Sequence, residues 1–273
     1  MTSEVMAVRT SVSYVEQMGD AGVLIREWRQ RRHFSQLELA SRAEVSTRHL
    51  SWIETGRSRP TSAMVLRLCD HLEVPLREQN AVLLAAGHAP AHPEHGLGEA
   101  PMAELNTALE TILAAHHPYP ALVVDRRWEL VAANDAAYGL LEGVDPAVLE
   151  PPINVIRLSI DPRGLAGRII NGAQWRAHLA ARLRREYDAT ADPFLGALHD
   201  EVLAAGELDH LGVTAALVTP LELRAADGGV LSFVSTTTVF GTPREVTLSE
   251  LAIEAFYPAD AATRQALAAT ARA

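Results

Sequence analysis

The chain has 273 residues, a formal net charge of −10 and 48% hydrophobic residues. This length accommodates two domains with separate hydrophobic cores. The single cysteine, Cys69, excludes an intramolecular disulfide and fits a reducing compartment. No apolar run approaches the roughly 18 residues of a membrane span, and residues 1–20 lack the pattern of a secretory signal. We therefore expect a cytoplasmic protein that does not associate with membranes.

The charge is unevenly distributed along the chain. All 24 basic residues are Arg, and the segment from Arg26 to Arg59 holds eight Arg against four Glu. Because the Debye length in solution is roughly 8–10 Å, acidic residues farther away than this hardly repel an anionic partner at the basic segment. An acidic body with one basic segment fits a protein that binds nucleic acid through a single domain.

Five short helices are predicted between residues 21 and 88, with residues 1–20 as a flexible tail. Ser35 and Glu38 form a capping box at the start of the second helix. Ser46 can cap the third helix, and Gly56 ends it. Because no strand pattern interrupts these helices, the segment predicts an all-α domain.

The second and third helices have the pattern of a helix-turn-helix. Small or apolar residues, Ala40, Val45 and Leu50, stand where the two helices would cross. The outer face of the third helix must be polar in order to reach base edges in the major groove. The residues on that face are Thr47, Arg48, Ser51 and Trp52.

The segment SQLELASRAEVSTRHLSWIETGRSRP, residues 35–60, resembles the DNA-binding domain of the xenobiotic-response-element (Cro and phage-repressor-like) family. The resemblance covers about residues 22–88 and implies a five-helix, lambda-repressor-like fold. The elements that carry it are Ser35-Gln36, Leu39-Ala40, Val45-Ser46, Ile53-Glu54 and Gly56-Arg57. A small helical bundle with a solvated basic face is the alternative.

The resemblance also implies roles for individual residues. Gln36 would bind a phosphate at the start of the second helix, and Arg57 and Arg59 would contact further phosphates. Arg29 and Glu54 match a buried ion pair of the family, which we expect to be structural. The residues implied in base reading are Thr47, Arg48 and Trp52, with His49 or Ser51. Trp52 departs from the polar residue often found at its position, so its indole would meet a thymine methyl or the sugar–phosphate edge.

A linker rich in Pro, Gly and His is predicted at residues 89–101, before a second domain at 102–262 and a C-terminal tail at 263–273. Helices are expected near 102–116, 135–143, 172–187 and 193–205. Strands are expected as a pair within 121–134 and as three more within 220–224, 230–240 and 250–258, with a hairpin turn DGG at 227–229. These elements predict an α+β domain with an antiparallel sheet.

The stretch PYPALVVDRRWELVAANDAAYGLL, residues 118–141, resembles the opening of a PAS-type sensor domain. With NVIRL (154–158), Trp175 in its amphipathic helix, and the strands after residue 230, it resembles the MmyB-like regulators. That resemblance implies a PAS-like ligand-binding domain whose hydrophobic pocket holds a fatty acid or a similar lipid. No other cofactor is implied.

An apolar pocket needs apolar walls and a polar anchor. The residues we expect at the ligand are Asn154, Arg157, Trp175, Leu179, Phe233 and Phe256. Val239 and Ile253 are further candidates for the walls. Arg157 could meet a carboxylate of the ligand bidentately, or it could pair with an internal Asp or Glu. The aromatic residues could equally be ordinary core.

Two function classes follow once DNA binding is granted. The C-terminal domain senses a small apolar ligand, or it serves only dimerisation or binding of a protein partner. A homodimer on an inverted-repeat operator in double-stranded DNA is expected in either case. We expect no enzyme, because the chain holds no G-x-S-x-G, phosphate-binding loop or H-E-x-x-H. His88, His92 and His95 fix no metal geometry, so we expect no metal site.

Overall fold

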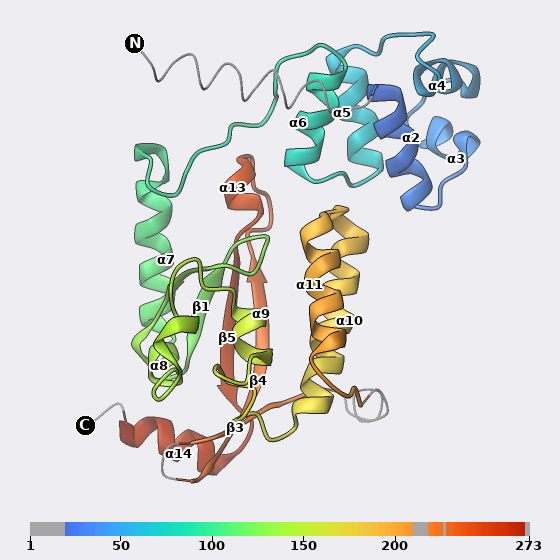
Figure 1. Ribbon diagram of the computed structural model, residues 1–273. Helices are drawn as coiled ribbons and strands as arrows, with labels where there is room; N and C mark the ends of the chain where they lie inside the picture. The colour runs from blue at the N-terminus through green and yellow to red at the C-terminus, as the bar shows by residue number, and fades with distance from the viewer. Residues whose placement is uncertain (1–19, 210–217, 226–227, 271–273) are drawn as a thin grey trace, which may run out of the picture. The chain divides into compact units, whose positions relative to one another are not determined.

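The chain forms two units in the computed structural model, which describes residues 20–209, 218–225 and 228–270 (Figure 1). The first unit comprises Met1–Glu94 with Arg244–Val246, and the second comprises His95–Pro243 with Thr247–Ala273. The N-terminal tail expected at residues 1–20 lies, apart from its last residue, outside the described residues.

Five helices build the part of the first unit that the structure describes, which confirms the all-α domain predicted from the sequence. They are α2 (Ala21–Arg31), α3 (Gln36–Arg42), α4 (Thr47–Glu54), α5 (Ser62–His71) and α6 (Leu76–Ala85). A polar side chain directly before each of the first four helices accepts a backbone N–H of the first turn; these caps are Asp20, Ser35, Ser46 and Thr61. Each cap satisfies a donor that the helix itself leaves unpaired, and so fixes where the helix begins.

Helices α2 and α4 approach each other closely at Gly22. A Cβ atom at Gly22 would overlap the carbonyl oxygen of Ile53, so any larger residue would push the two helices apart. The buried core of this unit includes Ile25, Trp28, Leu39, Leu50, Ile53, Val65, Leu68, Leu72 and Leu83. This core holds one side of α4, and the other side of the helix faces solvent.

Nine further helices and helical turns follow in the described chain. They are η1 (Ala100–Met102), α7 (Ala103–Ala115), α8 (Asp135–Gly139), η2 (Pro146–Val148), α9 (Val155–Ile160), α10 (Gly172–Thr190), α11 (Pro193–Ala204), α13 (Val246–Ser249) and α14 (Ala261–Thr270). Among the helices that the structure describes, none combines the length and apolarity needed to cross a membrane.

Among the residues with a described structure, five strands form one antiparallel sheet with the order β2-β1-β5-β4-β3. They are β1 (Ala121–Val124), β2 (Leu130–Ala133), β3 (Leu221–Arg224), β4 (Val230–Val239) and β5 (Ala252–Pro258). This arrangement confirms the α+β domain with an antiparallel sheet and both predicted hairpins. Residue 227 of the expected DGG turn lies outside the described residues.

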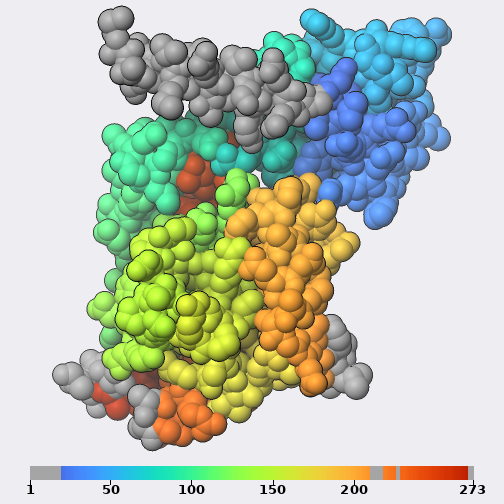
Figure 2. Space-filling model, in the orientation of Figure 1, coloured from blue at the N-terminus to red at the C-terminus, as the bar shows by residue number. Residues whose placement is uncertain are grey.

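The sheet separates two apolar clusters because the side chains of a strand alternate between its faces. Ile253 and Ala255 of β5 pack with Leu109 and Leu113 of α7 on one face. Phe256 packs on the opposite face, against a cluster contributed mainly by α9, α10, α11 and β3. In Figure 1, α7 accordingly lies on one side of the sheet and α10 with α11 on the other. Helices α10 and α11 pack against each other, and Figure 2 shows the atoms of this region in orange beside the yellow-green atoms of the preceding segment.

The C-terminal residues differ from the tail that the sequence suggests from residue 263. Helix α14 packs on the sheet: Thr263 is fully buried, and its Oγ1 accepts the Ser232 N–H at 2.9 Å. Leu267 joins the cluster that contains Phe233. The helix makes these contacts through single residues rather than through an apolar stripe, so hydrophobic periodicity gives no sign of it.

The expected linker at 89–101 is also more ordered than its composition suggests. The Asn80 side chain accepts the N–H groups of Ala91 and His92, each at 3.0 Å, and donates to the His92 carbonyl at 2.7 Å. Farther along, Leu97 packs against the cluster around α7. The two ends of the linker therefore belong to different units.

Candidate functional site

Helices α3 and α4 meet through a tight turn at residues 43–46. Glu44 has a positive φ of 53°, and the Val45 N–H donates to the Ala40 carbonyl at 2.9 Å. Ser46 then starts α4 by accepting the His49 N–H at 3.1 Å. This is the helix-turn-helix that the sequence predicts, with α4 in the place of the recognition helix.

The solvent side of α4 carries the residues expected to read bases. Arg48 and Trp52 are exposed, while Thr47, His49 and Ser51 are half-buried. The Arg48 guanidinium lies 4.6 Å from the centre of the Trp52 ring, which is within cation–π range. One turn of α4 thus presents a cation stacked on an indole, beside shorter polar groups.

Arg29 and Glu54 form the ion pair that the sequence resemblance implies. Nε and Nη2 of Arg29 donate to Oε1 and Oε2 of Glu54 at 2.6 and 2.9 Å, and the Glu54 side chain is 1% exposed. The same guanidinium donates from Nη1 to the Phe34 carbonyl at 2.8 Å. Gln36 donates to Glu54 Oε2 at 2.7 Å, so this amide is tied to the ion pair. A phosphate contact by Gln36 stays a prediction, as do those of the exposed Arg57 and Arg59.

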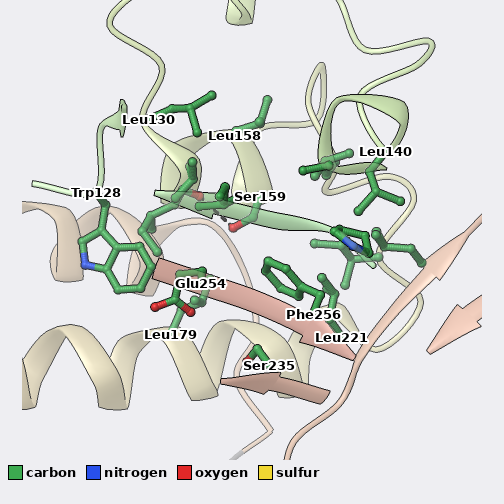
Figure 3. Close-up of a pocket in the computed structure, with 18 of the residues that line it drawn as sticks. Trp128, Leu130, Leu140, Leu158, Ser159, Leu179, Leu221, Ser235, Glu254 and Phe256 are labelled. Atoms are coloured by element: carbon green, nitrogen blue, oxygen red, sulfur yellow. Dashed lines mark hydrogen bonds between the residues drawn. The ribbon is translucent and has the colours of Figure 1, made fainter. Parts of the chain in front are cut away.

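The second unit contains a cavity of about 110 Å³ between the sheet and the helices. Its walls are mostly apolar: Leu122, Leu130, Leu140, Val155, Ile156, Leu158, Leu165, Ile169, Leu179, Leu221, Leu223 and Phe256 are among them. In Figure 3, Glu254 and Phe256 project toward the pocket from the same strand, with Trp128 at the Glu254 end. The register places both on one face, because they are two residues apart on β5.

One edge of the cavity is ionic. Arg182 donates from Nη1 and Nη2 to Glu254 at 3.0 and 2.6 Å, and from Nε to Glu186 at 3.0 Å. Burial lowers the pKa of the Arg182 guanidinium, but the hydrogen bonds and charge of Glu254 outweigh burial and raise it. The guanidinium also lies 4.2 Å from the centre of the Trp128 ring, whose Nε1–H donates to Glu186 at 2.8 Å. One cation is therefore shared by two carboxylates.

A second tryptophan differs from Trp128 in its hydrogen bonding. Trp175 lines the cavity, is 7% exposed, and its Nε1–H finds no acceptor among the residues that the structure describes. Its ring stacks on His178, with centroids 5.1 Å apart. Burial lowers the pKa of His178 below its usual value of 6.5, and the charges of Arg182 and Arg185 lower it further. This imidazole is therefore neutral near pH 7.

Three of the residues expected at the ligand line the cavity, and three do not. Trp175, Leu179 and Phe256 line it. Phe233 lies behind Phe256 in the core, edge to face with a centroid distance of 6.3 Å. Asn154 is occupied in capping α9, where it accepts the Arg157 N–H at 3.1 Å.

Arg157 is placed outside the cavity walls, with its guanidinium facing Glu201. Nε and Nη2 donate to the two Glu201 oxygens, each at 2.7 Å, and this pair is about half exposed. The hydrogen bond to Glu201 raises the pKa of Arg157, and the same bond lowers the pKa of Glu201. The internal pairing that the sequence left open is thus the one present, and the expected ligand anchor is not at the cavity.

Two other residues named for the walls also lie elsewhere. Val239 is 63% exposed, and Ile253 faces the α7 cluster on the other side of the sheet. The residues that sequence reasoning missed are Trp128, His178, Arg182 and Glu254. Glu254 had a detectable signal, because it shares its face of the strand with apolar Ala252 and Phe256.

His88, His92 and Cys69 are held by contacts within the fold rather than placed at a reactive site. Nε2 of His88 lies 2.9 Å from the Pro60 carbonyl, and Nε2 of His92 lies 2.9 Å from Gln79 Oε1. Burial, followed by the charge of Asp70, raises the pKa of the Cys69 thiol to about 12. Within the described ranges, no group of three or more His, Cys, Asp or Glu side chains is placed to hold a metal ion.

Models of known protein families match both units. The model of the MmyB-like transcription regulator ligand binding domain matches residues 105–269, and a helix-turn-helix domain model matches residues 20–82. A search of curated proteins finds no match. Among solved structures, an RNA-binding light-oxygen-voltage receptor is similar over 99% of this chain and 67% of that one, at 15% identity and a TM-score of 0.28.

Proposed function

The chain belongs to the MmyB-like transcription regulators, and from that premise we propose that a small apolar ligand in the cavity of the second unit modulates operator binding by α4. The observation that carries the proposal is the joining, in one chain, of a helix-turn-helix with an apolar cavity. The family is one of transcription regulators, which favours a regulator over an enzyme.

The surface of α4 supports specific DNA recognition. Arg48 can donate bidentately to guanine, the commonest specific contact in the major groove, while the Trp52 indole offers an apolar surface to a thymine methyl. Arg57 and Arg59, just beyond α4, are exposed and available to phosphates. Because such contacts release counterions, we expect binding to weaken steeply with salt.

We further propose that the regulator acts as a homodimer on an inverted repeat. One helix-turn-helix covers a single half-site, and two recognition helices on a dimer meet half-sites roughly 34 Å apart or a multiple of that distance. A ligand that prefers one dimer geometry then shifts the equilibrium between DNA-binding and non-binding states.

The ligand class is limited by the cavity. A fatty acid or a similar lipid is the ligand that the sequence resemblance implies, and the apolar walls suit an acyl chain. However, a volume of about 110 Å³ lies below the roughly 300–1,000 Å³ of common ligand sites. The cavity as observed therefore holds a small molecule or one end of a longer one, and a full acyl chain requires that lining side chains move.

The test is a native and a denaturing mass spectrum of gently purified full-length protein, followed by selection of operator sequences from random DNA. An extra mass of a few hundred daltons that is lost on denaturation supports the ligand function. A clean apo mass that stays unchanged after incubation with acyl compounds favours the alternative, in which the second unit serves only dimerisation or a protein partner. The DNA-binding part is tested separately with R48A and W52A.

For these two variants, R67A is a matched control, because Arg67 is an exposed arginine on α5 rather than on α4. We expect R48A to lose about 1–3 kcal/mol of operator binding free energy and to relax the base preference at one position. Equal losses in R48A and R67A would contradict the assignment of α4 as the recognition helix.

A further inference from the structure

The two outermost strands of the sheet are covered by neighbouring segments of the chain. Beside β2, an antiparallel bridge joins Glu129 to Asn154, and beside β3, another joins Ile169 to Leu223. Such covering is common in proteins, because an open strand edge exposes backbone N–H and C=O groups that pair readily with another chain.

Strand β4 has an edge without such a cover, because it continues beyond its neighbour β3. It pairs with β5 from Phe233 to Val239, but with β3 only from Val230 to Phe233. Residues 234–239 therefore have a neighbouring strand on one side only, as far as the described residues go. Residues 236–239 are all exposed, and the Val239 side chain is among the most exposed apolar ones, at 63% for the residue.

A hydrogen bond near the start of β4 fixes which backbone groups face this open edge. The Ser232 carbonyl accepts the Ala259 N–H at 2.8 Å on the β5 side, and the backbone groups of successive residues alternate between the two sides of a strand. The register with β5 runs without a shift to Val239, so the N–H and C=O groups of Ser235, Thr237 and Val239 face away from β5. None of these groups has a partner in the described part of the chain.

The side chains along this edge suit a second copy of the same strand. The segment VSTTTV, residues 234–239, contains no charged residue and no Pro, and these are residues that keep many edge strands from pairing. An antiparallel pair centred on Thr237 places Thr236 opposite Thr238 of the partner subunit, and such Thr pairs stabilise a sheet. Each chain has a formal net charge of −10, so an uncharged segment lets two copies meet without like charges in contact.

We propose that two copies of the chain associate through residues 234–239 of β4, paired antiparallel about a two-fold axis at Thr237. The two sheets then form one continuous sheet, joined by backbone hydrogen bonds as in other cases of strand addition. The same edge is used in both copies, so the assembly closes at a dimer. This inference rests on the homodimer of the proposed function and assigns the surface through which it forms.

The first test measures self-association of the full-length chain by sedimentation over a range of concentrations. T237P removes an N–H that faces the open edge and leaves the groups that face β5 in place, a position at which Pro is tolerated in a strand. Both copies lose this donor. We expect self-association to weaken by about thirtyfold, the factor that corresponds to ~2 kcal/mol for two hydrogen bonds.

Charged variants test the register of the pair. T236K/T238K and T236E/T238E each place like charges opposite one another across the axis, so each variant alone should be monomeric at concentrations where the wild type is dimeric. An equimolar mixture of the two should restore the dimer, because lysine then faces glutamate. T107K/T111K is the matched control: it changes two exposed threonines of α7 and should leave the dimer intact.

Hydrogen exchange distinguishes a second copy from other occupants of the edge. The Thr237 amide should be protected where the chain is dimeric and should exchange rapidly on dilution. Protection that does not depend on concentration would show that another segment of the same chain covers the edge, and would overturn the assignment.

The remaining outcomes separate this inference from the function on which it rests. A dimer that survives T237P and both charged variants would overturn the β4 interface while the homodimer stands. A wild-type chain that stays monomeric, alone and on operator DNA, would overturn both and leave the edge to an extended segment of another protein.

Discussion

Replacing Arg29 by Met removes the cation of the buried Arg29–Glu54 ion pair in the helical unit and leaves the carboxylate in place. The variant loses the two charge-assisted hydrogen bonds to Glu54, at 2.6 and 2.9 Å, and the bond to the Phe34 carbonyl at 2.8 Å. The Glu54 carboxylate stays buried and keeps the bond from Gln36 at 2.7 Å. Since removing one partner of a buried pair costs about 3–5 kcal/mol, we expect a loss of that size in the free energy of unfolding of this unit.

The double variant R29M/E54M distinguishes two causes of the lost stability: the unpaired, buried Glu54 carboxylate and the lost packing of the Arg29 side chain. Apolar residues of similar volume often replace a buried ion pair without loss of stability, so the double variant should recover most of what R29M loses. The assay is hydrogen exchange of the α2 and α4 amides in the full-length chain at increasing urea, because a chain with two units need not unfold in one step. A loss below about 1 kcal/mol in R29M, or a double variant as unstable as the sum of the two single variants, would refute the reasoning.

Three further variants or treatments test single features. G22A should lower the helical unit's unfolding free energy by about 1–3 kcal/mol, because its Cβ meets the Ile53 carbonyl; an unchanged urea midpoint for that unit would contradict this. Cys69 should resist alkylation at pH 8 until the protein unfolds, since burial raises the pKa of its thiol to about 12; labelling of the native protein at the rate of a free thiol would disprove it. R157A should change stability by less than about 1 kcal/mol, because its pair with Glu201 is about half exposed, and should leave ligand retention intact; loss of a bound mass would return Arg157 to the site.

The helical unit could be predicted from the sequence nearly residue by residue. Its signals are local: Ser35 and Ser46 cap helices in place, and the spacing from Ala40 to Leu50 fixes the helix-turn-helix. Even the Arg29–Glu54 pair followed from a motif resemblance, although the two residues lie 25 positions apart. The role of Gln36 in completing this pair was not predicted, because an amide at a helix start gives no sign of its partner.

The cavity of the second unit was predicted less well, because its walls come from residues far apart in the chain. Trp175 and Leu179 were found through helical periodicity, which shows the buried side of one helix. Periodicity does not distinguish a side chain at the cavity from one behind it, as Phe233 and Phe256 show. Arg157 has apolar neighbours in sequence, yet α9 turns it toward Glu201 and solvent.

The ionic edge of the cavity is better explained by the defined arrangement that it imposes on its side chains than by a gain in folding stability. Glu254 occupies an inward position of β5, where an apolar residue would pack against Leu122 and its neighbours at no desolvation cost. Its carboxylate pairs with Arg182, and Arg182 in turn contacts Glu186 and the Trp128 ring. Buried ion pairs seldom stabilise a fold more than apolar residues do. These contacts fix the relative positions of Arg182, Glu186, Glu254 and Trp128, and so define the shape of this edge of the cavity.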